Sequence, residues 1–123
     1  DYGAFTPIQV AAATAINSSQ EHVSQIRKVY KNRRDVLIES MKRVGWNIPN
    51  PEATMFAWAP IPKKYLSKGS IYFSKVLLKK ASLAVSPGIG FGSYGDKHVR
   101  ISLVENEQRI RQAARNIKNN LSF

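Results

Sequence analysis

One arginine stands in a pattern that could bind an anion. Residues 98–103 alternate strictly between polar and apolar side chains: His98, Val99, Arg100, Ile101, Ser102 and Leu103. Because side chains in a strand point to alternate faces, the pattern predicts a strand with Arg100 on its polar face. A guanidinium carries a planar fork of N–H donors that matches a carboxylate or a phosphate, and a strand holds it more rigidly than a loop does. We therefore predict that Arg100 recognises an anion.

A simpler interpretation of Arg100 stays open at this point. On composition alone, an arginine in such a strand is most often a solvated residue on the open face of an antiparallel sheet. It would then pair with an acidic residue across the strand. The two interpretations differ in what surrounds the guanidinium.

The segment before this strand is rich in glycine. Gly88, Gly90 and Gly92 occupy alternate positions, where the backbone can take positive φ or approach a ligand closely. The spacing is not a dinucleotide fingerprint, because a strand follows, and the Gly-Lys-Ser/Thr of a phosphate-binding loop is absent. A wide hairpin connection with a second turn at Asp96 explains the segment as well. We predict strand, turn and strand over residues 83–103.

Composition limits the other kinds of site. The chain has no cysteine, which excludes disulfides and thiolate metal sites. His22 and His98 fall on different predicted elements without an acidic cluster, so no metal site is expected. No apolar run is long enough to span a membrane and no signal peptide is recognisable, so we expect a soluble, cytoplasmic protein. The chain begins with Asp1 rather than Met, from which we expect a piece of a longer protein.

The charge balance offers an alternative function. Nineteen lysines and arginines against eight acidic residues give a formal net charge of +11 in 123 residues, which is typical of nucleic-acid-binding domains. The basic residues are, however, spread over three segments, 27–43, 63–80 and 109–118, and no known nucleic-acid-binding motif accompanies them. A piece separated from an acidic partner domain would be equally basic.

Helical patterns account for much of the chain. Residues 6–17 form a predicted helix with Thr6 as its cap, and its side chains are apolar nearly all round, so it needs burial on more than one side. Ser18 and Glu21 match a capping box that opens the longest helix, which ends at Gly45. Ser70 is predicted to cap a third helix with apolar positions Ile71, Phe73, Leu77, Leu78 and Ala81. A last helix begins after Val104.

Two more strands are predicted between the long helix and the third one. They cover residues 46–48 and 54–59, and prolines follow each of them. Both faces of the second strand are apolar, which indicates a missing partner domain or the wall of an active site, and Trp58 is assigned to the core. The whole order predicts an α/β two-layer sandwich, in which helices cover one face of a small, mainly antiparallel sheet.

The segment from residue 84 to residue 106 carries a family resemblance. Its motifs are Ser86-Pro87-Gly88, Gly90-Phe91-Gly92, Gly95-Asp96, His98-Val99-Arg100 and Glu105-Asn106. With them the chain resembles the C-terminal end of class I/II aminotransferases, pyridoxal-phosphate enzymes of fold type I. It is most similar to the branch of alanine-synthesising and LL-diaminopimelate aminotransferases. The resemblance extends from Asp1-Tyr2-Gly3 through Met55-Phe56-Ala57-Trp58 to Arg109-Ile110-Arg111.

The resemblance implies a division of the chain and a set of roles. Residues 1–17 would be a remnant of the large-domain and interface segment, and residues 18–123 the C-terminal small domain. Arg100 would bind the α-carboxylate of an amino acid or a 2-oxo acid, and Phe56 would lie near that substrate. Tyr2 and Gly3 would lie near the phosphate of the cofactor, pyridoxal 5'-phosphate. The full enzyme would be a homodimer.

One family feature is missing from the chain. Neither Ser67-Lys68 nor Ser74-Lys75 is followed by the Gly-x-Arg that accompanies the Schiff-base lysine of the family. The resemblance therefore implies that the cofactor is bound mainly by a large domain outside this chain, and that the piece alone is inactive. Two other hypotheses stay open: a basic nucleic-acid-binding α/β module, and an interaction domain with an exposed apolar face.

Overall fold

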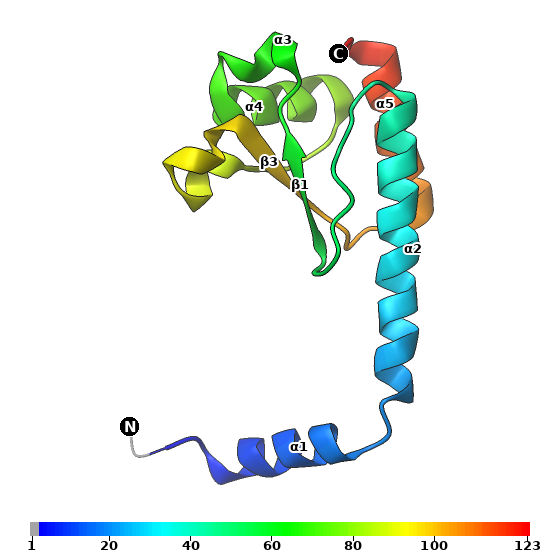
Figure 1. The fold of residues 1–123 in the computed structure, drawn as a ribbon, viewed down its shortest axis with the longest axis vertical. Coiled ribbons are helices and arrows are strands. Elements are labelled where there is room, and N and C mark those ends of the chain that lie inside the picture. The colour runs from blue at the N-terminus through cyan, green and yellow to red at the C-terminus, as the bar shows by residue number, and fades with distance from the viewer. Residues whose placement is uncertain (1–2) are drawn as a thin grey trace.

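The computed structural model describes residues 3–123. Figure 1 shows its helices, strands and two 3-10 turns. Their bounds are α1 Thr6–Asn17, α2 Glu21–Arg43, β1 Phe56–Pro60, α3 Lys63–Leu66, α4 Gly69–Ala81, β2 Ser86–Pro87, η1 Gly88–Phe91, η2 Ser93–Lys97, β3 His98–Ser102 and α5 Glu107–Asn120.

The three strands form one antiparallel sheet with β3 in the centre, in the order β1-β3-β2. On β3, Arg100 lies opposite Trp58 of β1 and Ser86 of β2. Residues that face each other across an antiparallel pair share a face of the sheet. Trp58, Arg100 and Ser86 therefore stand on the same face.

The other face of the sheet carries the core. Ala57, Ala59, Val99 and Ile101 are buried there. The helices close the core with buried side chains that include Leu37, Met41, Phe73, Leu77, Ile110, Ala114 and Ile117. The predicted two-layer α/β sandwich with helices on one face is confirmed.

The N-terminal end of the molecule extends away from this sandwich. Figure 1 shows α1 at the far end of α2 from the sheet, and no residue of α1 is buried. Helix formation alone stabilises such a segment little, because most helical stability comes from packing of an apolar face. The sequence predicts that this apolar helix needs burial, and residues 3–123 do not bury it.

Three predicted helix starts are wrong in detail. Phe5, not Thr6, is the N-cap of α1. The Ser18–Glu21 capping box does not form, because Ser18 Oγ donates to Thr14 O at the end of α1, at 2.6 Å, and Gln20 is the N-cap of α2. Ser70 does not cap α4 but lies inside it, after Lys68 and Gly69. Helix ends depend on tertiary contacts that a local pattern does not contain.

Two further predictions about regular structure are wrong. Residues 46–48 form no strand: Trp46 follows the left-handed turn at Gly45, φ 84°, and its N–H returns to Met41 O at 2.9 Å. Ile71 and Leu78 are exposed, at 52% and 56%, rather than part of the buried stripe of α4, which consists of Ser70, Phe73, Leu77 and Ala81.

Candidate functional site

Arg100 stands on the sheet face that the helices leave open. The pairing of β3 with strands on both sides fixes its backbone, and Val99 and Ile101, its neighbours along β3, are buried in the core. The Arg100 side chain is partly buried. The alternation in the sequence thus predicted both the strand and the face correctly.

Two phenylalanines contact the guanidinium. Its Cζ atom lies 4.2 Å from the centroid of the Phe56 ring and 4.4 Å from that of the Phe91 ring. Both distances are well within the range of a cation–π interaction. Phe56 comes from β1 on one side of β3, and Phe91 ends the turn η1, which follows β2 on the other side. The rings therefore reach Arg100 from the two sides of its strand.

A tryptophan and a histidine continue this aromatic surface. The Trp58 ring meets Phe91 edge to face, with 5.7 Å between centroids, and stacks on His98 at 5.3 Å with an interplanar angle of 18°. Trp58 is 38% exposed, so its assignment to the core is wrong. It lies on the Arg100 face because it shares the register of Phe56, two residues away. We define the open face as Phe56, Trp58, Ser86, Phe91, His98 and Arg100.

The simpler interpretation of Arg100 expects an acidic residue across the strand. Within residues 3–123, the ion pairs are Lys31–Asp35, Arg34–Asp35 and Arg43–Glu39, all on α2. The residues across the strand from Arg100 are Trp58 and Ser86, and neither is acidic. The guanidinium is thus held by aromatic rings rather than by a carboxylate of the described chain. Such an arrangement leaves its N–H donors for an external anion.

The glycine-rich segment forms two 3-10 turns instead of a hairpin loop. Only Ser86 and Pro87 belong to a strand before the turns, so the predicted strand from Leu83 is shorter than expected. In the two turns, the backbones of Gly88 and Gly95 lie so close that a Cβ on either would overlap the carbonyl of the other. The two glycines fix the position of the turn that presents Phe91.

A buried serine of α4, Ser70, connects this helix to both 3-10 turns. Ser70 N and Oγ both donate to Asp96 Oδ1, at 2.9 and 2.7 Å, and Ser70 Oγ accepts from Ile89 N at 3.1 Å. The hydrogen bond from the Ser70 backbone is the largest cause that lowers the pKa of Asp96, and the one from its hydroxyl adds to it. The sequence predicts a cap at Ser70 and a turn at Asp96, but no local pattern indicates that the two residues are in contact.

We expect Asp96 to make the fold sensitive to acid. Because its pKa is lower in the folded than in the unfolded chain, its stabilisation is present above the unfolded pKa, about 3.9. It is lost as the pH falls through the folded value. Asp96→Asn keeps an oxygen acceptor without the charge and should flatten this dependence. Unfolding midpoints of both proteins between about pH 2 and pH 6 would test this, and equally steep losses in acid would contradict it.

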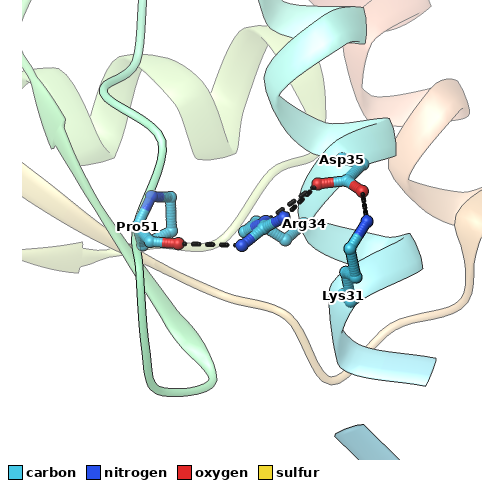
Figure 2. A network of polar contacts seen from close by, with 4 residues as sticks. All are labelled: Lys31, Arg34, Asp35 and Pro51. Atoms are coloured by element: carbon cyan, nitrogen blue, oxygen red, sulfur yellow. Dashed lines mark hydrogen bonds and ion pairs between the residues drawn. The ribbon is translucent and has the colours of Figure 1, made fainter. Parts of the chain in front are cut away.

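A second polar cluster holds the loop before β1. Figure 2 shows Arg34 on α2 between Asp35 and the loop. Arg34 Nη1 donates to Pro51 O at 3.3 Å, while its Nη2 pairs with Asp35 Oδ1 at 2.6 Å and Lys31 pairs with Asp35 Oδ2 at 2.9 Å. The hydrogen bond from Lys31 and then that from Arg34 lower the pKa of Asp35. This cluster anchors residue 51, five residues before Phe56.

An open groove of about 760 Å³ lies between α2 and residues 51–55. Arg27, Lys28, Lys31 and Arg34 border it, together with apolar Ile26 and Met55. None of the residues of the open face lines this groove. Arg33, the residue before Arg34, does not line the groove; its Nη1 donates to Leu103 O and Val104 O, at 3.2 and 3.0 Å.

The predicted site residues are only partly brought together. Arg100 and Phe56 are in contact. Gly3 precedes α1 with φ 94° and is exposed, and α1 lies well away from the sheet (Figure 1). Tyr2 lies outside the described residues. Phe91, Trp58 and His98 were not predicted as site residues, although Trp58 shares the strand face of Phe56 and Phe91 is flanked by glycines in a turn.

Between residues 3 and 123, no group of three or more His, Asp or Glu side chains could hold a metal ion. Over the same residues, no helix combines the length and the apolar composition needed to cross a membrane.

Comparisons with known proteins agree with the resemblance. The model of the family "Aminotransferase class I and II" matches residues 2–117. The putative aminotransferase AatC of Rhizobium meliloti (strain 1021) is 60% identical over 122 residues, which are 99% of this chain and 30% of AatC. Glutamate-pyruvate aminotransferase AlaC of Escherichia coli (strain K12) is 53% identical over 118 residues, 96% of this chain and 29% of AlaC. LL-diaminopimelate aminotransferases are among the other relatives.

The structure of the chain also matches solved structures. The structure of substrate-bound BacF from Bacillus subtilis matches with a TM-score of 0.86 and 36% sequence identity, over 98% of this chain and 31% of BacF. The chain spans about 30% of the length of AatC and AlaC. Since the family model covers nearly all of the sequence, the chain belongs to the class I and II aminotransferase family.

Proposed function

We propose that this chain is the substrate-binding part of a pyridoxal-phosphate-dependent aminotransferase that moves an amino group between an amino acid and a 2-oxo acid. Residues 18–123 would form its C-terminal small domain, and residues 1–17 the segment that leaves the large domain. The observation that carries the proposal is Arg100, held on a central strand between two aromatic rings and facing no acid of the described chain.

Arg100 would bind the α-carboxylate shared by both substrates. A planar guanidinium engages a carboxylate through two parallel N–H···O bonds, which fix the orientation as well as the position of the substrate. A charge-assisted hydrogen bond of this kind contributes about 1.5 to 3 kcal/mol. The bound carboxylate would hold the Cα–H bond in one direction for proton abstraction by groups outside this chain. Phe56 would form the apolar wall beside it.

The open face does not by itself fit the cofactor. Its six residues, Phe56, Trp58, Ser86, Phe91, His98 and Arg100, include no lysine for a Schiff base and no carboxylate for the pyridine nitrogen. The proposal therefore places pyridoxal 5'-phosphate mainly on the part of the enzyme outside this chain, and the isolated chain would be inactive. Contacts of Tyr2 and Gly3 with the cofactor phosphate, a homodimer and a cytoplasmic location remain predictions.

The full-length protein provides the test of this function. Loaded with pyridoxal 5'-phosphate, it should change its cofactor absorbance when mixed with a productive amino acid, and return to the first spectrum with a 2-oxo acid. A panel of amino donors would identify the substrate class. Absence of a cofactor band, together with salt-sensitive binding of RNA or DNA, would favour the alternative of a basic nucleic-acid-binding module. None of the relatives described above is named as a nucleic-acid-binding protein.

A further inference from the structure

The two rings that contact Arg100 have no evident role in the core. The core lies on the opposite face of the sheet, with Ala57 and Val99. Phe91 is 51% exposed, and Phe56 is partly buried. Exposed aromatic rings that surround a cation are typical of a binding surface rather than of packing.

The position of Phe91 is firmly determined. The backbone of η1 is held by the contact of Gly88 with Gly95 and by the bond from Ile89 N to Ser70 Oγ. The Phe91 ring packs edge to face on Trp58, which itself stacks on His98. The Phe91 ring thus packs against a side chain of β1 and lies beside Arg100.

We propose that Phe91, together with Phe56, is a positioning residue for Arg100: the two rings cover the guanidinium and leave its N–H edge for the carboxylate of the substrate. This inference rests on the function proposed above. An arginine side chain is flexible, and binding through it costs the entropy of ordering it. Rings in contact with Cζ at 4.2 and 4.4 Å restrict that freedom before the substrate arrives. Preorganisation of this kind increases affinity without adding a contact to the ligand.

The test is Phe91→Leu in the full-length aminotransferase. Leucine keeps an apolar side chain but removes the ring, so the KM for the amino acid should rise about tenfold, with kcat changed less than about twofold. Inhibition by a simple carboxylate that competes with the substrate should weaken by a similar factor. Phe91→Tyr restores a ring and should return both constants to near the wild-type values. Tyr72→Leu is the matched control. Lys68 Nζ lies 4.6 Å from the centroid of the Tyr72 ring, but this ring belongs to α4 and not to the open face.

A second comparison separates this inference from the proposed function. If Phe91 acts through Arg100, Phe91→Leu should have no further effect on KM in an Arg100→Ala background. A Phe91→Leu protein with KM within twofold of the wild type, beside an impaired Arg100→Ala protein, would overturn the inference alone. Effects of the two changes that simply multiply would also overturn it. Unchanged kinetics of Arg100→Ala would overturn the proposed function.

Discussion

Replacing Arg100 by lysine is expected to raise the KM for the amino acid substrate roughly 10- to 100-fold in the full-length enzyme. The range follows from the loss of about 1.5 to 3 kcal/mol of charge-assisted hydrogen bonding, at 1.4 kcal/mol for each factor of ten. Lysine keeps the positive charge but has no planar fork. It also lacks the flat group that lies over Phe56 and Phe91 in the wild type. Steady-state kinetics with one amino donor would measure the effect.

A matched substitution shows whether the effect belongs to the site. Arg109→Lys makes the same chemical change at an exposed position of α5, on the helical layer of the sandwich. Its KM should stay at the wild-type value. Arg100→Ala removes the charge as well and should lower kcat/KM more than Arg100→Lys does. Equal kinetic constants for Arg100→Lys and the wild type would show that the carboxylate is bound elsewhere.

The central strand of the site was predictable because its alternating pattern is compatible with only one assignment of side chains to the two faces of the sheet. Residues 98–103 alternate between polar and apolar types, and a slip of one residue would bury Arg100 and expose Val99. The pairing with β1 brings Phe56 close to Arg100. Local sequence and tertiary structure agree at this strand.

The rest of the open face could not be predicted, for two physical reasons. Both faces of β1 are apolar, so periodicity could not show which side packs on the helices, and Trp58 was assigned to the wrong one. The turn that carries Phe91 has no periodicity at all, and its path depends on the contact between Gly88 and Gly95. The partnership of Ser70 with Asp96 joins residues 26 positions apart, which no local signal encodes.

The contact between Gly88 and Gly95 also predicts a large loss of stability when Gly88 is replaced. Gly88→Ala should destabilise the fold by about 3 kcal/mol, the upper part of the usual range for overpacking. The new Cβ would overlap the backbone oxygens of Gly95 and His98. Backbone atoms cannot rotate away as the end of a flexible side chain can, so η1 and η2 would have to separate. Thermal unfolding of the full-length protein, with hydrogen exchange of residues 83–103, would measure the loss.

Gly90→Ala is the control within the same turn. A Cβ at Gly90 would have no heavy atom within 4 Å, and Gly90 does not have positive φ. Alanine there should be neutral or stabilise the fold by about 0.4 to 1 kcal/mol, through the lower entropy of the unfolded chain. Because η1 carries Phe91, Gly88→Ala should also raise the KM of whatever enzyme remains folded, while Gly90→Ala should not. If Gly88→Ala and Gly90→Ala had the same effect on stability and the same effect on KM, the contact between the two turns would not be what positions Phe91 beside Arg100.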